Sequence, residues 1–422
     1  MFDAFMQTLT GPCCVKQGDS VLVCVSGGID SMVLLELMQR ASSLLRLRIG
    51  AIHVDHGIRM TDSAADAQFV LQHCKELSIE TFFKELGMKP EAPNLEEEAR
   101  HRRYEAILEC KNNGGYHFAA TGHTLDDQAE TILYRIIRGT GIRGLAGIAY
   151  TRPDGLIRPM LDISRRQVED YARQEGIRHV LDKTNENLKH SRNLIRHSII
   201  SVMEHINPRV VHAVARLAQI AQDEGSLLDQ EALQLGKEAI LFDWRIIKGY
   251  SMDSLRKAPD TIIKRLIINE VALMLGEPRG IDAIQVNAIL DVLKGKAGGH
   301  TVKRKVTALI DGSSFIFRTA IDGPYYHVPV NKEASFSLPE INTWVRVSLP
   351  MQPDDDLVIR SFMNGDRVGK KKVSEILAGM GVPQALRPFW PVLVSGKEII
   401  AVASHDEKKI QSGVIFEVHH GK

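Results

Sequence analysis

The sequence predicts an α/β protein that begins with a parallel, twisted sheet and continues with an all-α middle domain and a small α+β C-terminal domain. Three observations lead to this prediction. Strand and helix patterns alternate over the first half of the chain, helical patterns alone follow, and short strand patterns return after a glycine-rich, basic joint, GKAGGHTVKRK. Because alternating strands and helices connect through βαβ crossovers, we expect three domains, at residues 1–207, 208–295 and 296–422.

The expected elements follow from local patterns. Short, β-branched or alternating apolar runs predict strands, and apolar residues three or four apart predict helices. The expected N-terminal strands are 21–25, 48–54, 80–86 and 116–122. The first long helix is expected to begin at the SGGIDS turn, and further helices are expected at 61–77, at 94–111 and in a segment that runs through Arg138. Later helices are expected from Pro208 and at 261–275 and 281–293, and later strands at 306–320 and 398–404.

Composition excludes several classes of protein. The 422 residues include 53 Lys and Arg against 52 Asp and Glu, so net charge indicates no polyanionic partner, and 44% hydrophobic residues suffice for several cores. The five cysteines all lie between Cys13 and Cys110 and include no C-x-x-C pair, which favours reduced thiols and a cytoplasmic location. No apolar run approaches the ~20 residues of a membrane span.

The first motif, SGGIDS, occupies the turn between the first strand and the first long helix. Its residues are Ser26, Gly27, Gly28, Ile29, Asp30 and Ser31. Glycines allow close approach of a ligand, the serines add hydroxyls, and the helix N-terminus attracts anions. The turn lacks the lysine of a Walker P-loop, so we expect it to hold the pyrophosphate of ATP and expose the α-phosphorus, with Asp30 helping to bind Mg²⁺. The alternative is a plain glycine turn.

The second and third motifs follow the next strand ends. In HVDHGIR, Asp55 and His56 are expected to form a wall of the ATP pocket, although a polar turn or a zinc site are alternatives. TGHTLDDQAET then places Gly122 and His123 at the end of another strand.

Two acids of the third motif, Asp127 and Glu130, share one face of the helix that follows. They could hold Mg²⁺ or accept a proton, but Thr124 and Asp127 also have the spacing of a capping box.

Basic residues follow in the third and fourth motifs and near the C-terminus. Arg138 lies on the same predicted helix as the acidic pair, and Arg192 and Arg196 are four residues apart beside Asn193. These side chains suit contacts with phosphates or bases, although a solvated helix face is an alternative. Lys370, Lys371 and Lys372, together with Arg367, form a basic edge in the C-terminal domain that suits contacts with phosphates.

The motifs together resemble the N-type ATP pyrophosphatases of the PP-loop superfamily. The matching stretches are SGGIDS, HVDHGIR, TGHTLDDQAET with RGTGIRGLAG, and DKTN followed by RNLIR, while LVIRSFMNGDRVG extends the similarity toward the C-terminus. Thr124 stands where the family often has a second histidine, and Thr184 where it often has serine.

The combination is similar to the branch of that family that modifies an isoleucine tRNA with the anticodon CAU. The resemblance implies adenylation of the wobble cytidine with ATP and Mg²⁺, attack by free lysine, and release of AMP. With that chemistry, Asp30, Asp127 and Glu130 are the candidate catalytic residues, and Asp30 and Asp127 are candidate Mg²⁺ ligands, with Asp127 open as a ligand, a base or a helix cap. We expect the domains at 208–295 and 296–422 to bind the tRNA, the latter through its basic edge, and a homodimer is left open.

Three other classes remain as alternatives. A tRNA thiolase would need a thiolate or iron–sulfur cysteines, and the sequence has no C-x-x-C pair. An amide-forming synthetase would need ammonia, often from a glutaminase, and no clear glutaminase motif is present. A nucleotide-binding module without catalysis would not explain the acidic pair or the two added domains.

Overall fold

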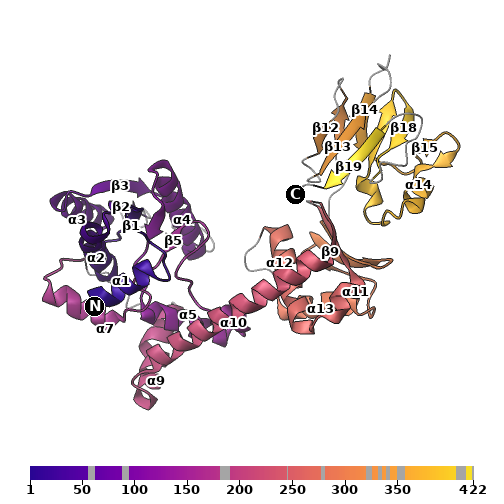
Figure 1. Ribbon diagram of the computed structural model, residues 1–422. Coiled ribbons are helices and arrows are strands. Elements are labelled where there is room, and N and C mark those ends of the chain that lie inside the picture. The colour runs from indigo at the N-terminus through magenta and orange to yellow at the C-terminus, as the bar shows by residue number, and fades with distance from the viewer. Residues whose placement is uncertain are drawn as a thin grey trace. The chain divides into compact units, whose positions relative to one another are not determined.

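The computed structural model describes residues 1–55, 62–87, 95–180, 191–244, 246–276, 281–319, 326–330, 335–338, 343–348, 357–404 and 415–420. The chain forms two units, Met1–Gly225 and Ser226–Lys422, and helix α10, Val210–Ala239, contains the boundary between them (Figure 1). The division into three domains stays a prediction. His56 and Thr184, and the whole DKTN motif, lie outside the described residues.

The first unit contains a five-stranded sheet in the order β3-β2-β1-β4-β5. The strands are β1 Ser20–Cys24, β2 Arg48–Asp55, β3 Glu80–Glu85, β4 Phe118–Ala120 and β5 Leu156–Ile157. Each neighbouring pair is parallel, which confirms the predicted parallel sheet. The strand order runs outward from β1 to β3 and then returns to place β4 on the other side of β1. In such sheets, ligands bind at the carboxyl ends of the strands where the order reverses, here between β1 and β4.

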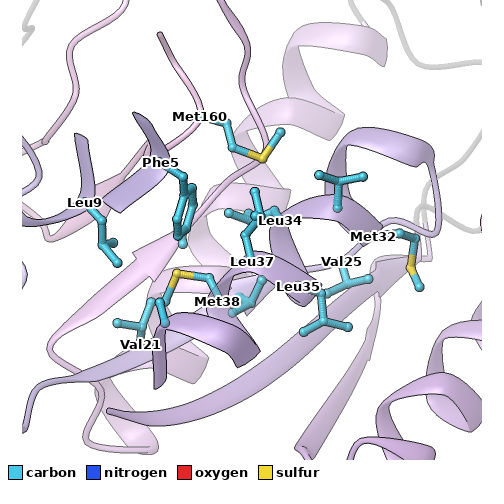
Figure 2. Packing of buried hydrophobic residues seen from close by; sticks show 14 of the residues in the cluster. Phe5, Leu9, Val21, Val25, Met32, Leu34, Leu35, Leu37, Met38 and Met160 are labelled. Atoms are coloured by element: carbon cyan, nitrogen blue, oxygen red, sulfur yellow. The ribbon is translucent and has the colours of Figure 1, made fainter. Parts of the chain in front are cut away.

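Helices cover both faces of this sheet. The helices of this unit are α1 Phe2–Thr10, α2 Ile29–Leu45, α3 Asp62–Glu76, α4 Leu95–Asn113, α5 Leu125–Ile137, α6 Ile142–Leu145, α7 Arg165–Gln174, α8 Ser191–Leu194, the π-helix Ile195–Ile200 and α9 Ser201–Ile206, and of these α5 and the π-helix form a cluster of their own with the start of α10. Successive residues of β1 point to opposite faces, so Val21 and Val23 join the core with α2, whereas Leu22 packs with Ile107 of α4. Figure 2 shows Val21 among the α2 residues of this core. Burying each large aliphatic side chain contributes about 1.5–3 kcal/mol, and both faces thereby hold β1 in place.

The second unit starts with helices and an antiparallel sheet. Helices α11 Met252–Lys257, α12 Asp260–Leu275 and α13 Ala283–Leu293 accompany a sheet in the order β6-β7-β10-β9-β8. Its strands are β6 Ile240–Trp244, β7 Ile247–Ser251, β8 Gly299–Val302, β9 Val306–Asp311 and β10 Ser314–Thr319. The predicted helices are present, but β6 and β7 are strands within the region expected to be all-α. They form because β7 pairs with β10, a partner more than sixty positions later, so Ile247 lies opposite Arg318.

The C-terminal part of this unit contains further antiparallel strands. One sheet joins β11 His327–Pro329, β14 Leu357–Ser361, β17 Pro391–Ser395 and β18 Glu398–Val402, and another joins β12 Ser335–Leu338, β13 Thr343–Ser348 and β19 Ile415–His420. The small elements are β15 Arg367–Val368, β16 Lys371–Lys372, α14 Val373–Gly379 and the 3₁₀ helix η4 Arg387–Phe389. The rings of Trp244 and Trp390 stack at 5.7 Å in the shared core. Across the described residues, no helix has the length and apolar character needed to cross a membrane.

Candidate active site

A cavity of about 650 Å³ lies at the carboxyl ends of the central strands of the first unit. Residues at or just beyond the ends of β1, β2 and β4 line it, together with the start of α2, the inner face of α4 and the start of α5. The lining residues are Cys24, Val25, Ser26, Asp30, Ser31, Ile52, His53, Val54, Asp55, Asp66, Arg100, Arg103, Tyr104, Ile107, Thr121, Gly122, His123, Asp127 and Arg192. Eight residues that the sequence analysis names as site candidates are thus brought together at the switch point between β1 and β4.

The turn between β1 and α2 is held open by its own hydrogen bonds. Gly27 has a φ of +91°, which a side chain would strain, and Gly28 begins α2 without a side-chain cap. The Ser31 hydroxyl donates to the Gly28 carbonyl at 2.9 Å and accepts from the Ser26 N–H at 3.1 Å. Ser31 therefore braces the turn, while the uncapped helix start faces the cavity and can receive an anion.

Gly122 explains why the loop after β4 can reach this turn. A Cβ atom there would lie 3.0 Å from the carbonyl oxygen of Asp30 and 3.3 Å from the backbone nitrogen of Ser31. Only glycine permits that approach without moving backbone. The loop that carries His123 is thus fixed against the first turn of α2.

Asp30 is the acid of the cavity that lacks a partner. Its Oδ1 atom is buried and has no hydrogen-bond partner among the described residues. Burial raises the pKa of its carboxyl group to about 6, and the charges of Arg165 and Arg196 oppose the rise. A buried carboxylate without a partner is costly, which suits a group that receives a cation with its ligand.

The donor set fits Mg²⁺ rather than a metal held by protein alone. In the described part of the chain, no three His, Cys, Asp or Glu side chains are grouped to hold a metal ion. Mg²⁺ is usually bound by one or two carboxylates together with substrate phosphates and water. Asp30 and Asp127, which both line the cavity, match that requirement.

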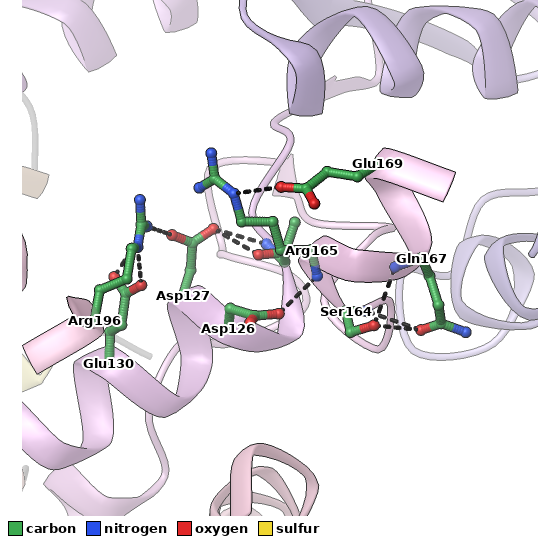
Figure 3. A network of polar contacts seen from close by, with 9 residues as sticks. Asp126, Asp127, Glu130, Ser164, Arg165, Gln167, Glu169 and Arg196 are labelled. Atoms are coloured by element: carbon green, nitrogen blue, oxygen red, sulfur yellow. Dashed lines mark hydrogen bonds and ion pairs between the residues drawn. The ribbon is translucent and has the colours of Figure 1, made fainter. Parts of the chain in front are cut away.

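The acidic pair of α5 is already engaged (Figure 3). Asp127 accepts hydrogen bonds from the Thr124 N–H at 2.8 Å and from its hydroxyl at 3.2 Å, so the capping box is present. Glu130, whose side chain is 2% exposed, accepts two hydrogen bonds from Arg196, at 2.5 and 3.2 Å. Arg196 also lies 3.6 Å from Asp127. Glu130 therefore anchors Arg196 and is not open to a ligand in this arrangement, because both of its oxygens are occupied.

Sequence reasoning missed the basic wall contributed by α4. Arg100 and Arg103 line the cavity, and their guanidinium carbons lie 5.3 and 5.7 Å from the ring centre of Tyr104. Arg152 approaches the same ring at 5.1 Å. Guanidinium groups stacked on an aromatic ring are oriented in advance for phosphates. The three-residue spacing of Arg100 and Arg103 was the available signal, but α4 carries charges all round, so no face stood out.

Two further groups define what the cavity can do chemically. Burial lowers the pKa of His123 to about 3, so its ring is neutral near pH 7 and hydrogen-bonds the Thr121 hydroxyl at 2.9 Å. Burial raises the pKa of the Cys24 thiol to about 12, so it stays protonated and is a poor nucleophile. The cavity thus offers a neutral imidazole and no thiolate from Cys24.

The remaining predicted residues have varied positions. Arg138 lies outside the cavity and donates to the Tyr134 hydroxyl at 3.0 Å. His53 of the HVDHGIR motif lines the cavity, but it is buried and its Nδ1 atom is bonded to the Val25 carbonyl at 2.8 Å, so the protein itself satisfies this histidine. Lys370, Lys371 and Lys372 are exposed in the second unit. Their roles, and that of Asn193, stay predictions.

The parallel sheet and the open helix start at its switch point are the arrangement that the sequence predicts for a PP-loop domain, a class of domain that uses ATP. Residues 2–203 match the family model described as PP-loop domain, so this part of the chain is a PP-loop domain. The predicted resemblance is confirmed, and it reaches further than this domain.

Over nearly its whole length the chain is similar to tRNA(Ile)-lysidine synthases. It is 27% identical to that of Clostridioides difficile (strain 630), covering 96% of this chain and 95% of the relative. It is 28% identical to that of Solibacter usitatus (strain Ellin6076), covering 91% and 92%. With that of Thermotoga sp. (strain RQ2) it shares 40% identity over 49% of this chain and 50% of the relative.

Proposed function

We propose that this chain attaches lysine to carbon 2 of the wobble cytidine of a CAU-anticodon isoleucine tRNA, consuming ATP. The observation that carries the proposal is the similarity to tRNA(Ile)-lysidine synthases over 96% of the chain. The cavity supports it, because an uncapped helix start, an unpaired buried acid and a basic wall surround one space. The proposed location is the cytoplasm, where tRNA is found.

In the first step, the O2 atom of the cytidine attacks the α-phosphorus of ATP and pyrophosphate leaves. The first turn of α2 would hold the departing pyrophosphate through backbone N–H groups, and Arg100 and Arg103 line the same cavity. Mg²⁺, held by Asp30 and Asp127, would neutralise charge on the phosphates. Because its ring is neutral, His123 adds no positive charge beside the nucleotide.

In the second step, the ε-amine of lysine attacks carbon 2, a carbon–nitrogen bond forms, and AMP leaves with the cytidine oxygen. The amine must first lose a proton, which costs roughly 4 kcal/mol at neutral pH for a pKa of about 10.4. Asp127 is the proposed acceptor, as the alternative to its role as a Mg²⁺ ligand, because it lines the cavity and its carboxylate is held in place by Thr124 and Arg196.

Recognition of the tRNA is proposed to use basic residues of both units. Arg192 lines the cavity and is placed to meet the phosphates beside the inserted cytidine. Arg138 and Asn193 would extend this surface, and Arg196 would contribute charge while it remains paired with Glu130. Lys370, Lys371 and Lys372 would contact phosphates remote from the anticodon.

The second candidate function for this cavity is the transfer of sulfur to a tRNA. A thiolase of this fold needs a reactive thiolate, and the cysteine that lines the cavity, Cys24, has its pKa raised to about 12 by burial. This observation disfavours sulfur chemistry at that residue.

Mass spectrometry of nucleosides tests the proposal. Purified protein is incubated with Mg²⁺, ATP, lysine and either the isoleucine tRNA or elongator methionine tRNA, which shares the anticodon. Lysidine is expected in the first tRNA, with AMP and pyrophosphate released, and far less in the second. Sulfur in the product, or adenylation of a small acid without tRNA, would refute the assignment.

A further inference from the structure

A second cavity, of about 470 Å³, lies within the second unit. It is bounded on one side by β9 and β10 and on the other by the loop after β14, the start of α14 and the segment around η4. Its polar side chains include Arg318, Arg387, Asn364, Ser374 and Gln384, and Phe362 adds an aromatic ring. The cavity is large enough for a nucleotide, by comparison with the ~300–1,000 Å³ of ordinary ligand pockets.

Strand alternation shows that Arg318 is an unusual residue at its position. Phe315 and Phe317 of β10 pack into the core with the helices, whereas Ile316 packs into the other core, with Trp244 and Trp390. Arg318 follows Ile316 by two residues and therefore shares its face. Arg318 thus lies on the face of the sheet that carries Ile316 and Leu309, beside Thr307 of β9, and it lines the cavity.

In the part of the chain that the structure describes, the side chain of Arg318 has no hydrogen-bond or ion-pair partner, although it is only partly exposed. The second cation, Arg387, is held in position by a hydrogen bond from Nε to the Val382 carbonyl at 3.0 Å. The acid of the cavity, Asp311, already accepts from the Ala385 N–H at 2.8 Å. The cavity therefore presents an excess of positive charge.

We propose that this cavity binds the phosphate and base of a nucleotide. Two guanidinium groups match a phosphate, the Phe362 ring and Pro388 offer an apolar wall for a base, and the amides of Asn364 and Gln384 can bond its edge. A divalent cation is excluded by the two arginines, and a purely apolar ligand would leave them without partners. The nucleotide can come from two sources, a bound RNA chain or a free mononucleotide; the RNA source rests on the proposed function.

The RNA source is tested by filter binding of isoleucine tRNA to the full-length protein. Arg318→Ala should weaken binding about tenfold and lower the slope of log K against log salt by about 1. Arg318→Lys, which keeps the charge but not the planar fork, should recover part of the loss. The matched control is Arg256→Ala, which removes an exposed arginine of the same unit outside the cavity and should change binding less than twofold. Thermal unfolding confirms that each variant is folded.

The mononucleotide source is tested by calorimetric titration with AMP. Gly28→Val serves as the background, because it obstructs the first cavity. Binding that remains in this background and disappears in Gly28→Val with Arg318→Ala assigns AMP to the second cavity. A wild-type protein that neither binds nor modifies tRNA would refute the proposed function. The AMP titration would still test whether the second cavity binds a nucleotide. If Arg318→Ala and Arg256→Ala behave alike with both tRNA and AMP, the cavity is not a nucleotide site.

Discussion

The starts of helices α2 and α5 follow adjacent strands, β1 and β4, and both carry acids, yet they are used differently. At α5, Asp127 is bonded to Thr124 and Glu130 is bonded to Arg196. At α2, no side chain caps the helix, and a buried oxygen of Asp30 has no partner among the described residues. The acids of α5 are bonded to the protein and mainly stabilise the fold. The uncapped start of α2 and the unpaired oxygen of Asp30 instead indicate where a ligand would bind.

The largest expected effect is at the unsatisfied helix start. Gly28→Val should reduce ATP binding and pyrophosphate release by about a thousandfold or more, because its side chain fills the space needed by the phosphates. The fold should persist, since Gly28 has a φ of −71° and an added Cβ would lie 3.7 Å from the Ser26 hydroxyl oxygen. Isotope exchange between pyrophosphate and ATP measures the activity, and circular dichroism measures whether the fold persists. Gly298→Val, at a site with open space, is the control. A folded Gly28→Val protein with normal turnover would show that the start of α2 is not the phosphate site.

The next effect concerns the buried charge of Asp30. Its pKa of about 6 exceeds the ~3.9 of an unfolded chain, so the folded protein binds the proton more tightly and loses stability as pH rises between these values. Without Mg²⁺, Asp30→Asn should therefore raise the free energy of unfolding at pH 8 by up to about 3 kcal/mol, and not at pH 4. Urea titrations at both pH values measure this. Equal gains at the two pH values would show that Asp30 carries no such penalty.

Asp127 tests whether a capping acid can also act on the substrate. Asp127→Asn keeps an oxygen for the Thr124 N–H, so the loss of stability should not exceed about 1 kcal/mol. Turnover should fall about a hundredfold, because an amide neither accepts the proton nor holds Mg²⁺. Single-turnover lysidine formation and chemical denaturation give the two quantities. A variant that is less stable but fully active would assign Asp127 to capping alone.

The smallest effect is expected at the satisfied pair. Glu130→Gln leaves Arg196 without its main partner and should cost about 2 kcal/mol of stability, since the glutamate is almost fully buried. Removing both charges with Glu130→Gln and Arg196→Met should restore most of it. The control is Glu169→Gln, whose pair with Arg165 is 49% exposed on the glutamate side and is worth less than about 1 kcal/mol. An equal cost at both glutamates would show that burial is not the cause.

The sequence was informative where structure depends on neighbouring residues. The strand, turn and helix from Val21 to Met38 and the capping box at Thr124 were both visible in local spacing, and both are present. The sequence was uninformative where structure depends on distant residues. Glu130 and Arg196 meet across 66 positions, and β7 becomes a strand only because β10 pairs with it. No local pattern carries such information.

The basic wall of α4 was hidden for a different reason. The helix has charged residues on every side, so periodicity could not separate the face with Arg100 and Arg103 from the solvated ones. Only the position of α4 against the sheet, set by buried Ile107, gives those arginines a common direction.

The burial of the thiols has a practical consequence for labelling this protein. Cys13 and Cys74 are buried, Cys24 and Cys110 are partly shielded, and Cys14 is the one exposed cysteine of the five. Burial also raises the pKa of all four shielded thiols, so alkylating reagents that require a thiolate react with them slowly. A maleimide dye at neutral pH should therefore attach to Cys14 of the natural sequence alone, which gives a single fluorescent reporter without any engineered cysteine.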